Sequence, residues 1–440
     1  MPAAPGARRR AAVIGGNRIP FARANGAYAG ASNLDMLTVT LDGLAARFGL
    51  AGMRIGEVAG GAVLKHSRDR DLTREAVLGS RLAPTTPAYD VQQACGTGLE
   101  TAILVANKIA LGQLESGVAA GVDTASDAPV ALNDDLRRVL MDLHGAKTLG
   151  ARLKALAGIR PGQIVPEIPR NAEPRTGLSM GEHAAITALE WRVGREEQDE
   201  LAAASHRNLA AAYERGFFDD LITPYLGLTR DANLRADTSA ERLAKLEPVF
   251  GRGDGATMTA GNSTPLTDGA AAVLLGSDEW AAAHKLPVLA HVVDAETAAV
   301  DHVHGGDGLL TAPVFAVPRL LERNGMTLQD FDFYEIHEAF ASTVLATLAA
   351  WEDPAFAKER LGLDAPLGSI DRSRLNVAGS SLATGHPFAA TGGRIVATLA
   401  KLLHEQGTSG GGRGDGRPGR GLISICAAGG QGVTMILEAA

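Results

Sequence analysis

The chain has 440 residues, 45% of them hydrophobic, which is enough apolar material for two or three domains with large cores. Its 42 basic and 50 acidic side chains give a formal net charge of −8, and this balance argues against a nucleic-acid partner. The apolar run that follows three arginines at positions 8–10 is too short for a signal peptide or a membrane span. We therefore expect a globular, cytoplasmic protein.

The first half of the chain alternates strand-like and helix-like segments. In chain order we expect a strand at 11–14, a helix at 34–48, an apolar glycine-containing segment at 58–64, a helix at 99–111 and a strand at 117–122.

The second half repeats this order. We expect a strand at 288–293, a helix at 314–323, a strand at 331–336, a glycine turn at 379–385, a helix at 392–404 and a strand at 422–426. The glycine-rich segment 407–420 is expected to be a surface loop. Strands that alternate with helices predict parallel sheets with helices on their faces, and the repeated order predicts an internal duplication.

The segment between the halves, residues 127–255, is predicted to be an inserted and mostly helical domain. We therefore divide the chain into an N-terminal half (1–126 with 256–285), this insertion, and a C-terminal half (286–440). Residues 136–160 carry six basic side chains against one acid, Asp142, with apolar residues at near-helical spacing. A solvated helix face and a contact with an anionic ligand, a protein partner or a membrane surface are both compatible with this pattern.

Only two cysteines occur, and each lies beside a glycine-rich turn. Cys95 stands in Gln-Ala-Cys-Gly-Thr-Gly, a turn that would place its sulfur at a helix N-terminus, where the positive end of the helix favours a thiolate. Cys426 is followed by Ala-Ala-Gly-Gly, which leaves backbone N–H groups free to bind an oxyanion. Two buried apolar cysteines or one disulfide are the alternatives, although a cytoplasmic setting disfavours the disulfide.

Two histidines are candidates for proton transfer. His337 begins His-Glu-Ala-Phe-Ala, but no second histidine follows four residues later, so a two-histidine zinc face cannot form and we expect no metal site. His386 stands between Gly385 and Pro387, which fixes its backbone and suits either a general base or a capping histidine.

These motifs, together with Thr259-Ala-Gly-Asn262 and Asp268-Gly-Ala-Ala271, occur in an order and spacing that resemble the thiolase family of acyl-CoA:acetyl-CoA acyltransferases. The resemblance covers the chain from the first strand to the last residue. It implies an α/β thiolase fold of two duplicated α-β-α-β-α halves with a loop domain over the active site. It also implies CoA-dependent cleavage of a 3-ketoacyl-CoA through an acyl-cysteine.

The family resemblance implies a role for each candidate. His386 would take the proton of Cys95, the nucleophile, and Cys426 would protonate the departing enolate. His386 and a water held by His337 would stabilise the thioester oxygen, while the backbone N–H groups of Cys95 and Ala428 would hold the acyl carbonyl. Residues expected at the CoA site are Met180, Arg235, Leu246, Thr264, Ala339 and Phe340. No cofactor is implied, because coenzyme A is a substrate.

Many short-chain thiolases carry Asn where this chain has His337. The histidine and the basic stretch 136–160 resemble thiolase subunits of fatty-acid β-oxidation complexes, which implies medium or long acyl chains and a hydratase-dehydrogenase partner subunit. The family also implies a homodimer or tetramer. The alternatives are a short-chain acetyl-CoA C-acetyltransferase and a non-catalytic acyl-CoA or sterol carrier.

Two more distant alternatives are weaker. A nucleotide-binding oxidoreductase would need Gly-x-Gly-x-x-Gly after the first strand, and the chain lacks it. Decarboxylating ketoacyl synthases usually use one cysteine, so Cys426 favours a thiolase.

Overall fold

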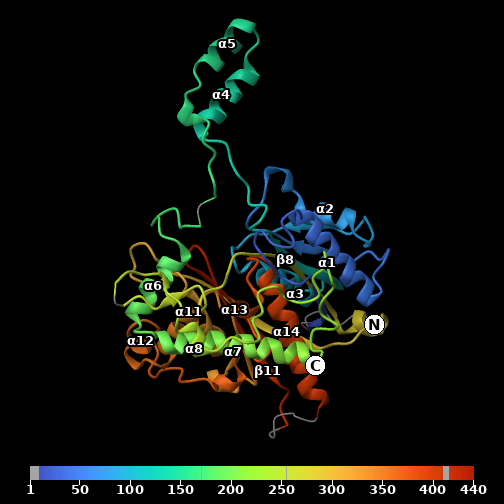
Figure 1. Cartoon of the computed structure of the whole chain (residues 1–440). Helices are drawn as coiled ribbons and strands as arrows, with labels where there is room; N and C mark the ends of the chain where they lie inside the picture. Colours follow the sequence, from blue (N-terminus) through green and yellow to red (C-terminus); the bar gives the residue numbers. More distant parts are fainter. Residues whose placement is uncertain (1–8, 170, 254, 410–415) are drawn as a thin grey trace.

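The computed structural model describes residues 9–169, 171–253, 255–409 and 416–440 (Figure 1). Residues 410–415 of the predicted loop at 407–420 lie outside these ranges. No helix within the described ranges combines the length and apolar character that a membrane crossing demands.

The elements of the N-terminal half are β1 (Ala11–Arg18), β2 (Ala22–Arg23), α1 (Asn33–Phe48), β3 (Val58–Gly60), α2 (Leu72–Gly79), β4 (Ala88–Asp90), α3 (Thr97–Ala110), β5 (Ser116–Asp123), β7 (Met258–Thr259), β8 (Thr267–Ser277) and α9 (Asp278–Ala283). Those of the insertion are α4 (Asp134–Gly145), α5 (Leu149–Ala157), α6 (Met180–Glu190), α7 (Arg195–Glu214), α8 (Ala240–Leu243) and β6 (Pro248–Phe250). Those of the C-terminal half are β9 (Ala290–Ala299), α10 (Ala312–Asn324), β10 (Phe333–Ile336), α11 (Ala341–Glu352), α12 (Pro354–Glu359), α13 (Ser381–Thr384), α14 (Ala390–Thr408), β11 (Arg420–Ala427) and β12 (Gln431–Ala439). Short 3₁₀ helices are Ser67–Asp69, Pro161–Gln163, Leu328–Asp330 and Arg372–Arg374.

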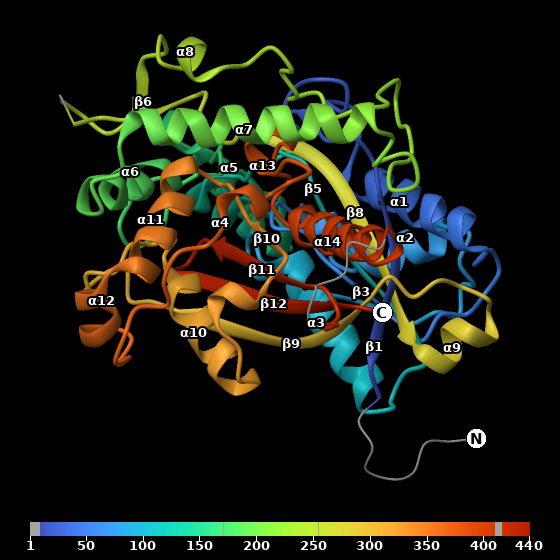
Figure 2. The same cartoon turned by 90° about the horizontal axis from the view of Figure 1, so that it is seen from below.

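Helices form three layers around the strands. The strand order is β10-β11-β12-β9-β1-β8-β5-β3-β4, with β2 paired to β8. Helices α1 and α2 pack on the N-terminal strands, α10 and α11 on the C-terminal strands, and α3 and α14 contact strands of both halves (Figure 2). The predicted α/β fold with a five-layer α-β-α-β-α arrangement is confirmed.

Alternating side chains along single strands fill different cores, as the period of two in a strand requires. Val13 points into the central core around α3 and α14, whereas its neighbour Ile14 packs in the outer core with α1. In β11, Ile423 belongs to the central core and Leu422 to the outer core with α10. Such strands are apolar on both faces because helices cover both faces.

The prediction of parallel sheets is wrong for most strand pairs. Among the strands of the described residues, the parallel pairs are β3–β4, β3–β5 and β10–β11. β8 pairs antiparallel with β1 and β5, and β12 pairs antiparallel with β9 and β11. Among the strands not predicted from the sequence are β8 and β12, which lie between other strands in the interior of the sheet. β12 follows β11 after a turn at 428–430, and such a tight connection can join only antiparallel neighbours.

The regular elements of the insertion are helices apart from β6, although long loops join them, and the insertion has two parts. Helices α6 and α7 pack against α11 and α13 of the C-terminal half. In contrast, α4 and α5 bury no residue and stand out from the body as a helical hairpin (Figure 1). The bounds of the predicted domain division stay a prediction.

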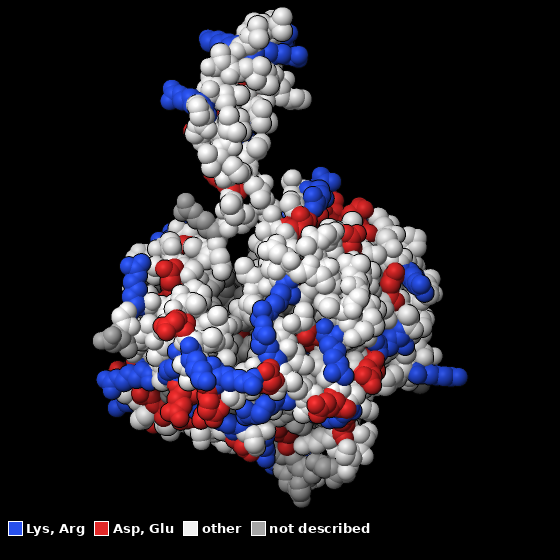
Figure 3. Space-filling model, viewed as in Figure 1, with Lys and Arg blue, Asp and Glu red and all other residues white. Residues whose placement is uncertain are grey.

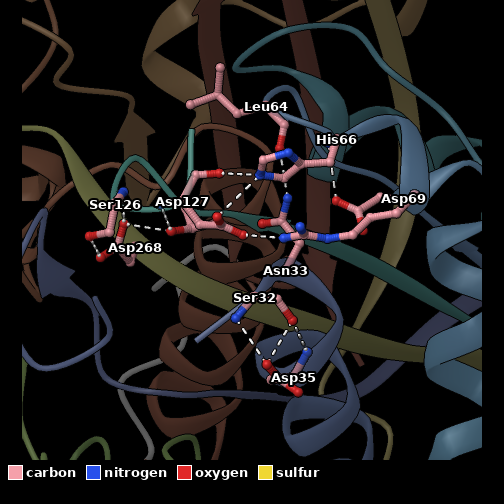
Figure 4. A network of polar contacts seen from close by, with 11 residues as sticks. Ser32, Asn33, Asp35, Leu64, His66, Asp69, Ser126, Asp127 and Asp268 are labelled. Carbon is pink, nitrogen blue, oxygen red and sulfur yellow. Dashed lines mark hydrogen bonds and ion pairs between the residues drawn. The ribbon is translucent and has the colours of Figure 1, made fainter. Parts of the chain in front are cut away.

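Polar contacts fix the start of the insertion to the N-terminal half (Figure 4). The backbone carbonyl of Asp127 lies 2.9 Å from Nε2 of His66, and its carboxylate accepts a 2.7 Å bond from Arg68. The backbone N–H of Ser126 donates to Asp268 of β8 over 2.9 Å. These contacts therefore hold the first residues of the insertion in place against the N-terminal half.

Glycines let the central helices touch through their backbones. A Cβ on Gly98 of α3 would lie well inside 3.0 Å of the Ala389 carbonyl, and a Cβ on Gly392 of α14 would lie equally close to the backbone of Leu99. A side chain there would force the two helices apart.

Gly98→Ala should therefore lower the free energy of unfolding by about 1–3 kcal/mol or more, because overpacking has to move backbone rather than a flexible side chain. Urea unfolding measures this change. Gly150→Ala is the matched control, since a Cβ at Gly150 in α5 meets open space. Equal unfolding midpoints for both variants would contradict the close approach of α3 and α14.

Candidate active site

Cys95 occupies a tight turn between β4 and α3. Ala94, the preceding residue, has a φ of 47°, in the left-handed region that non-glycine residues rarely adopt. The Thr97 hydroxyl closes the turn, because it donates to the Ala94 carbonyl over 2.7 Å and accepts from the N–H of Gln93 over 2.9 Å. These hydrogen bonds hold the strained turn and so fix the direction of the thiol.

The expectation that the helix start favours a thiolate is not met in the resting protein. Burial raises the pKa of Cys95 to about 12, although hydrogen bonds from the backbone N–H groups of Ala428 and of Cys95 itself lower it. Desolvation disfavours the charged form more than these donors favour it. Cys95 is therefore a neutral thiol near pH 7.

Two buried imidazoles lie beside Cys95. His337 follows β10, and His386 lies in the turn between α13 and α14. Their ring centroids are 4.2 Å apart, and the Cys95 sulfur and one nitrogen of each ring lie within 4.8 Å of one another.

In each ring one nitrogen has a hydrogen-bond partner, and the other has none within the described part of the chain. Nδ1 of His337 lies 2.8 Å from the Ser381 hydroxyl, and Nδ1 of His386 lies 2.6 Å from the Thr391 hydroxyl. Neither Nε2 has a hydrogen-bond partner within the described part of the chain, and both are buried. An unbonded buried polar atom is costly, so these two atoms are the natural contacts for a substrate.

Both histidines are neutral at pH 7. Burial, followed by the positive charge of Arg394, lowers the pKa of His386 to about 3. Burial, His386 and Arg394 together hold the pKa of His337 well below its ordinary value. The imidazoles can therefore act as a base or as a neutral donor.

Cys426 and Ala428 approach from the end of β11. Cys426 is 4% exposed, and burial raises the pKa of its thiol, with nearby Cys95 adding to the effect. The Ala428 N–H favours the charged form of Cys95 and so lowers the pKa of that thiol. In the same turn the Gly429 N–H donates to the Glu173 carboxylate over 2.8 Å. The structure thus brings together all four predicted catalytic side chains and both predicted backbone donors.

Two buried acids hold the loops of the site in place, and neither was assigned to the site from the sequence. The Glu338 carboxylate accepts 2.7 Å bonds from the Ser205 hydroxyl and the Asn376 amide, and a 3.2 Å bond from the Leu382 N–H. It thereby joins α7 to the segment that leads to His386. Its position next to His337 was the sequence signal for this role.

Asp123 likewise joins segments that are distant in sequence, on the other side of the site. Its carboxylate accepts from the N–H groups of Leu64 at 2.7 Å and Ala389 at 2.8 Å, so β5 is tied to the start of α14. Burial raises the pKa of Asp123 to about 6. The lone acid at a strand end carried no motif that marked it.

Four of the predicted CoA-site residues lie together. Met180, Ala339 and Phe340 belong to one apolar cluster that also contains Cys426. Thr264 joins them, because its N–H donates to the Ala339 carbonyl over 3.1 Å and its hydroxyl donates to the Ser381 carbonyl over 2.9 Å.

The other two predicted CoA-site residues lie outside this cluster. Leu246 is 41% exposed, and the exposed Arg235 donates its backbone N–H to Nδ1 of His206 over 3.2 Å. Burial and the charge of Arg235 both lower the pKa of Arg23, so two guanidinium groups lie near each other. Figure 3 shows one face of the molecule, which has a hollow with basic side chains beside it.

Within the described ranges, one group of His, Cys, Asp and Glu side chains could share a metal ion, and it is Cys95, His337 and His386. A thiolate and two imidazoles are ligands that zinc accepts. Binding would require a lone pair on the ring nitrogen that each histidine turns toward the ion. The prediction of no metal site stays a prediction.

Comparisons with known proteins cover both halves of the chain. Residues 11–279 match the family model "Thiolase, N-terminal domain", and residues 286–439 match "Thiolase, C-terminal domain". A 3-ketoacyl-CoA thiolase of Pectobacterium carotovorum subsp. carotovorum is 39% identical over 435 residues, which is 98% of this chain and 96% of that protein. A 3-ketoacyl-CoA thiolase of Yersinia pestis is 38% identical, with 98% and 97% covered.

A crystal structure of the acetyl-CoA acetyltransferase of Bacillus anthracis has a TM-score of 0.79 to this chain at 30% identity, and the alignment covers 99% of this chain and 100% of that one. The family resemblance predicted from the motifs is confirmed.

The raised pKa of Cys95 makes a prediction for its alkylation. Below the pKa of a thiol, the thiolate fraction rises about tenfold per pH unit, so alkylation of Cys95 by iodoacetamide should accelerate about tenfold per unit from pH 7 to pH 9. Mass spectrometry of the Cys95 peptide measures the rate, and a free cysteine peptide is the control. A rate independent of pH in this range would instead indicate a preformed thiolate–imidazolium pair.

Proposed function

The chain belongs to the thiolase family of acyltransferases, and we propose that it is a 3-ketoacyl-CoA thiolase that forms acetyl-CoA and a shortened acyl-CoA. The observation that carries the proposal is the meeting of two thiols, two neutral imidazoles and the Ala428 N–H at one place in the fold.

In the first half-reaction, the Cys95 sulfur bonds to the 3-keto carbon while His386 takes the thiol proton on its free Nε2. A neutral thiol and a weakly basic imidazole make prior proton transfer unfavourable, so transfer and attack proceed together. The carbonyl oxygen becomes negative beside the N–H groups of Cys95 and Ala428, and one such donor contributes about 3 kcal/mol to transition-state stabilisation.

The bond between C2 and C3 then breaks, and its electron pair forms the enolate of acetyl-CoA. Cys426 supplies the proton to C2, and we propose that the Nε2 atoms of His337 and His386 donate to the enolate oxygen. In the second half-reaction the sulfur of free CoA attacks the acyl-cysteine while its proton passes to the Cys426 thiolate. The shortened acyl-CoA is released, and the departing Cys95 sulfur takes back the proton held by His386. Thiols and imidazoles suffice for every step, so we propose that no cofactor takes part.

The α4–α5 hairpin supports a place in fatty-acid β-oxidation on longer acyl chains. Large apolar side chains such as Leu149, which is 74% exposed, and Leu153, which is 58% exposed, alternate with the basic Arg152 and Lys154. A projecting surface of this kind fits a hydratase-dehydrogenase subunit or an anionic membrane. We also propose that the chain forms a homodimer or tetramer in the cytoplasm.

The proposal is tested by CoA-dependent loss of the Mg²⁺–enolate absorbance of 3-ketoacyl-CoA. We expect cleavage of both acetoacetyl-CoA and a long-chain substrate, with the higher kcat/KM for the long chain. A kcat/KM that peaks at acetoacetyl-CoA and collapses for longer chains would instead identify a short-chain acetyltransferase.

The two cysteines should fail in different ways when they are replaced. Cys95→Ala should give no covalent adduct with acyl-CoA by mass spectrometry and no turnover. Cys426→Ser should still form the adduct but turn over at least about 100-fold more slowly, because a serine hydroxyl is a far weaker acid than a thiol. Wild-type turnover by Cys426→Ser would remove Cys426 from the mechanism.

The hairpin should be dispensable for chemistry. Replacing 134–157 by a short Gly-Ser linker should leave acetoacetyl-CoA cleavage within about twofold of wild type, since α4 and α5 bury nothing. The same variant should lose sedimentation with anionic phosphatidylglycerol vesicles or binding to a purified hydratase-dehydrogenase subunit. If the full chain shows neither interaction, the hairpin is only a solvated surface.

A further inference from the structure

The proton of His337 is placed by a short chain of hydrogen bonds that begins at Arg394. Nη2 of Arg394 lies 3.1 Å from the Ser381 hydroxyl, and this hydroxyl lies 2.8 Å from Nδ1 of His337. All three side chains are buried, with 2%, 0% and 1% exposed for Arg394, Ser381 and His337.

The direction of these bonds follows from the chemistry of the donors. A guanidinium has N–H groups and no acceptor, so Ser381 accepts from Arg394. Burial lowers the pKa of Arg394 to about 10, which leaves it a cation at neutral pH.

The Ser381 hydroxyl then has one proton to place. Among the hydrogen bonds of the described residues, the only further partner of this hydroxyl is Nδ1 of His337. An unbonded hydroxyl in a buried site is costly, so Ser381 donates and Nδ1 accepts. A neutral imidazole with a bare Nδ1 carries its proton on Nε2.

We propose that Arg394 and Ser381 are positioning residues that hold His337 in the tautomer protonated on Nε2, so that the ring presents an N–H donor toward the acyl-transfer site. The tautomer is a property of the resting protein. Its catalytic consequence, a donor for the thioester oxygen or for a water beside it, rests on the proposed thiolase function.

The neighbouring histidine is arranged differently. Nδ1 of His386 contacts the Thr391 hydroxyl over 2.6 Å, and no arginine bonds that hydroxyl within the described part of the chain. No guanidinium fixes the direction of this bond, so the base role proposed for His386, which needs a lone pair on Nε2, requires Thr391 to accept the Nδ1 proton. Under the proposed function the two imidazoles, whose ring centroids lie 4.2 Å apart, take complementary roles, His337 as donor and His386 as base.

The same assignment bears on metal binding at Cys95, His337 and His386. A metal ligand needs a lone pair on the nitrogen that faces the ion, but His337 turns an N–H in that direction. Ligation by His337 would require reversal of the Ser381 hydrogen bond against the fixed donor Arg394.

Nitrogen-15 NMR of protein labelled at histidine tests the tautomer directly at pH 7. The signals of His337 are assigned by their loss in His337→Asn. We expect a proton on Nε2 and a bare Nδ1 in the wild type. A wild-type His337 that carries its proton on Nδ1 would overturn the inference, whatever the enzyme activity.

Kinetics with a matched pair of serine variants tests the consequence. Ser380 accepts from the same Nη2 of Arg394 over 3.2 Å, but within the described residues the hydroxyl bonded to Nδ1 of His337 is that of Ser381. Ser381→Ala should lower kcat by about 10- to 100-fold with little change in KM, the typical effect of losing a group that orients a catalytic imidazole. Ser380→Ala should stay within about twofold of wild type, and Ser381→Thr should recover most of the loss because it keeps the hydroxyl.

The outcomes separate this inference from the proposed function. An Nε2–H tautomer in a wild-type protein without thiolase activity would support the placement of the proton and refute the proposed function. An active wild type whose Ser381→Ala variant keeps both kcat and the tautomer would overturn the role of Ser381 as a positioning residue.

Discussion

The site depends on backbone contact between α3 and α14. Cys95 precedes α3 and His386 precedes α14, so the separation of these two helices sets the distance between the nucleophile and its base. Gly98 and Gly392 permit an approach that no side chain would allow, and Gly121 of β5 presses against the Ala389 backbone in the same way. Because one helix comes from each half, the active site exists only where the two halves meet.

Buried carboxylates complete this arrangement at the loops. Asp123 ties β5 to the start of α14, and Glu338 ties α7 of the insertion to the segment before His386. Each accepts several bonds from groups distant in sequence, which compensates the cost of burying an acid. The glycine contacts therefore fix the distance between α3 and α14, while these acids fix the positions of the loops that carry the reacting groups.

Sequence reasoning found the reacting groups better than it found their surroundings. Glycine-flanked Cys95, Cys426 and His386 stood out because such turns have few structural uses, and the family motifs supplied Ala428. Antiparallel β8 and β12 were missed, since a strand buried on both faces has no alternating pattern to mark it. The roles of Ser381 and Arg394 were missed because their hydrogen bonds join separate helices. A local sequence pattern carries no information about such contacts.

The least predictable property of the site was the charge of its thiols and imidazoles. A helix N-terminus and a nearby histidine argue for a thiolate at Cys95, yet burial outweighs both and leaves two neutral thiols and two neutral imidazoles. Such a site avoids the large desolvation penalty that isolated charges would impose on the resting fold. Charge then develops only when substrate is attacked, and it develops next to N–H donors that are already oriented. Low acidity of the resting thiol is thus compatible with catalysis, because the donors stabilise the transition state and leave the resting thiol neutral.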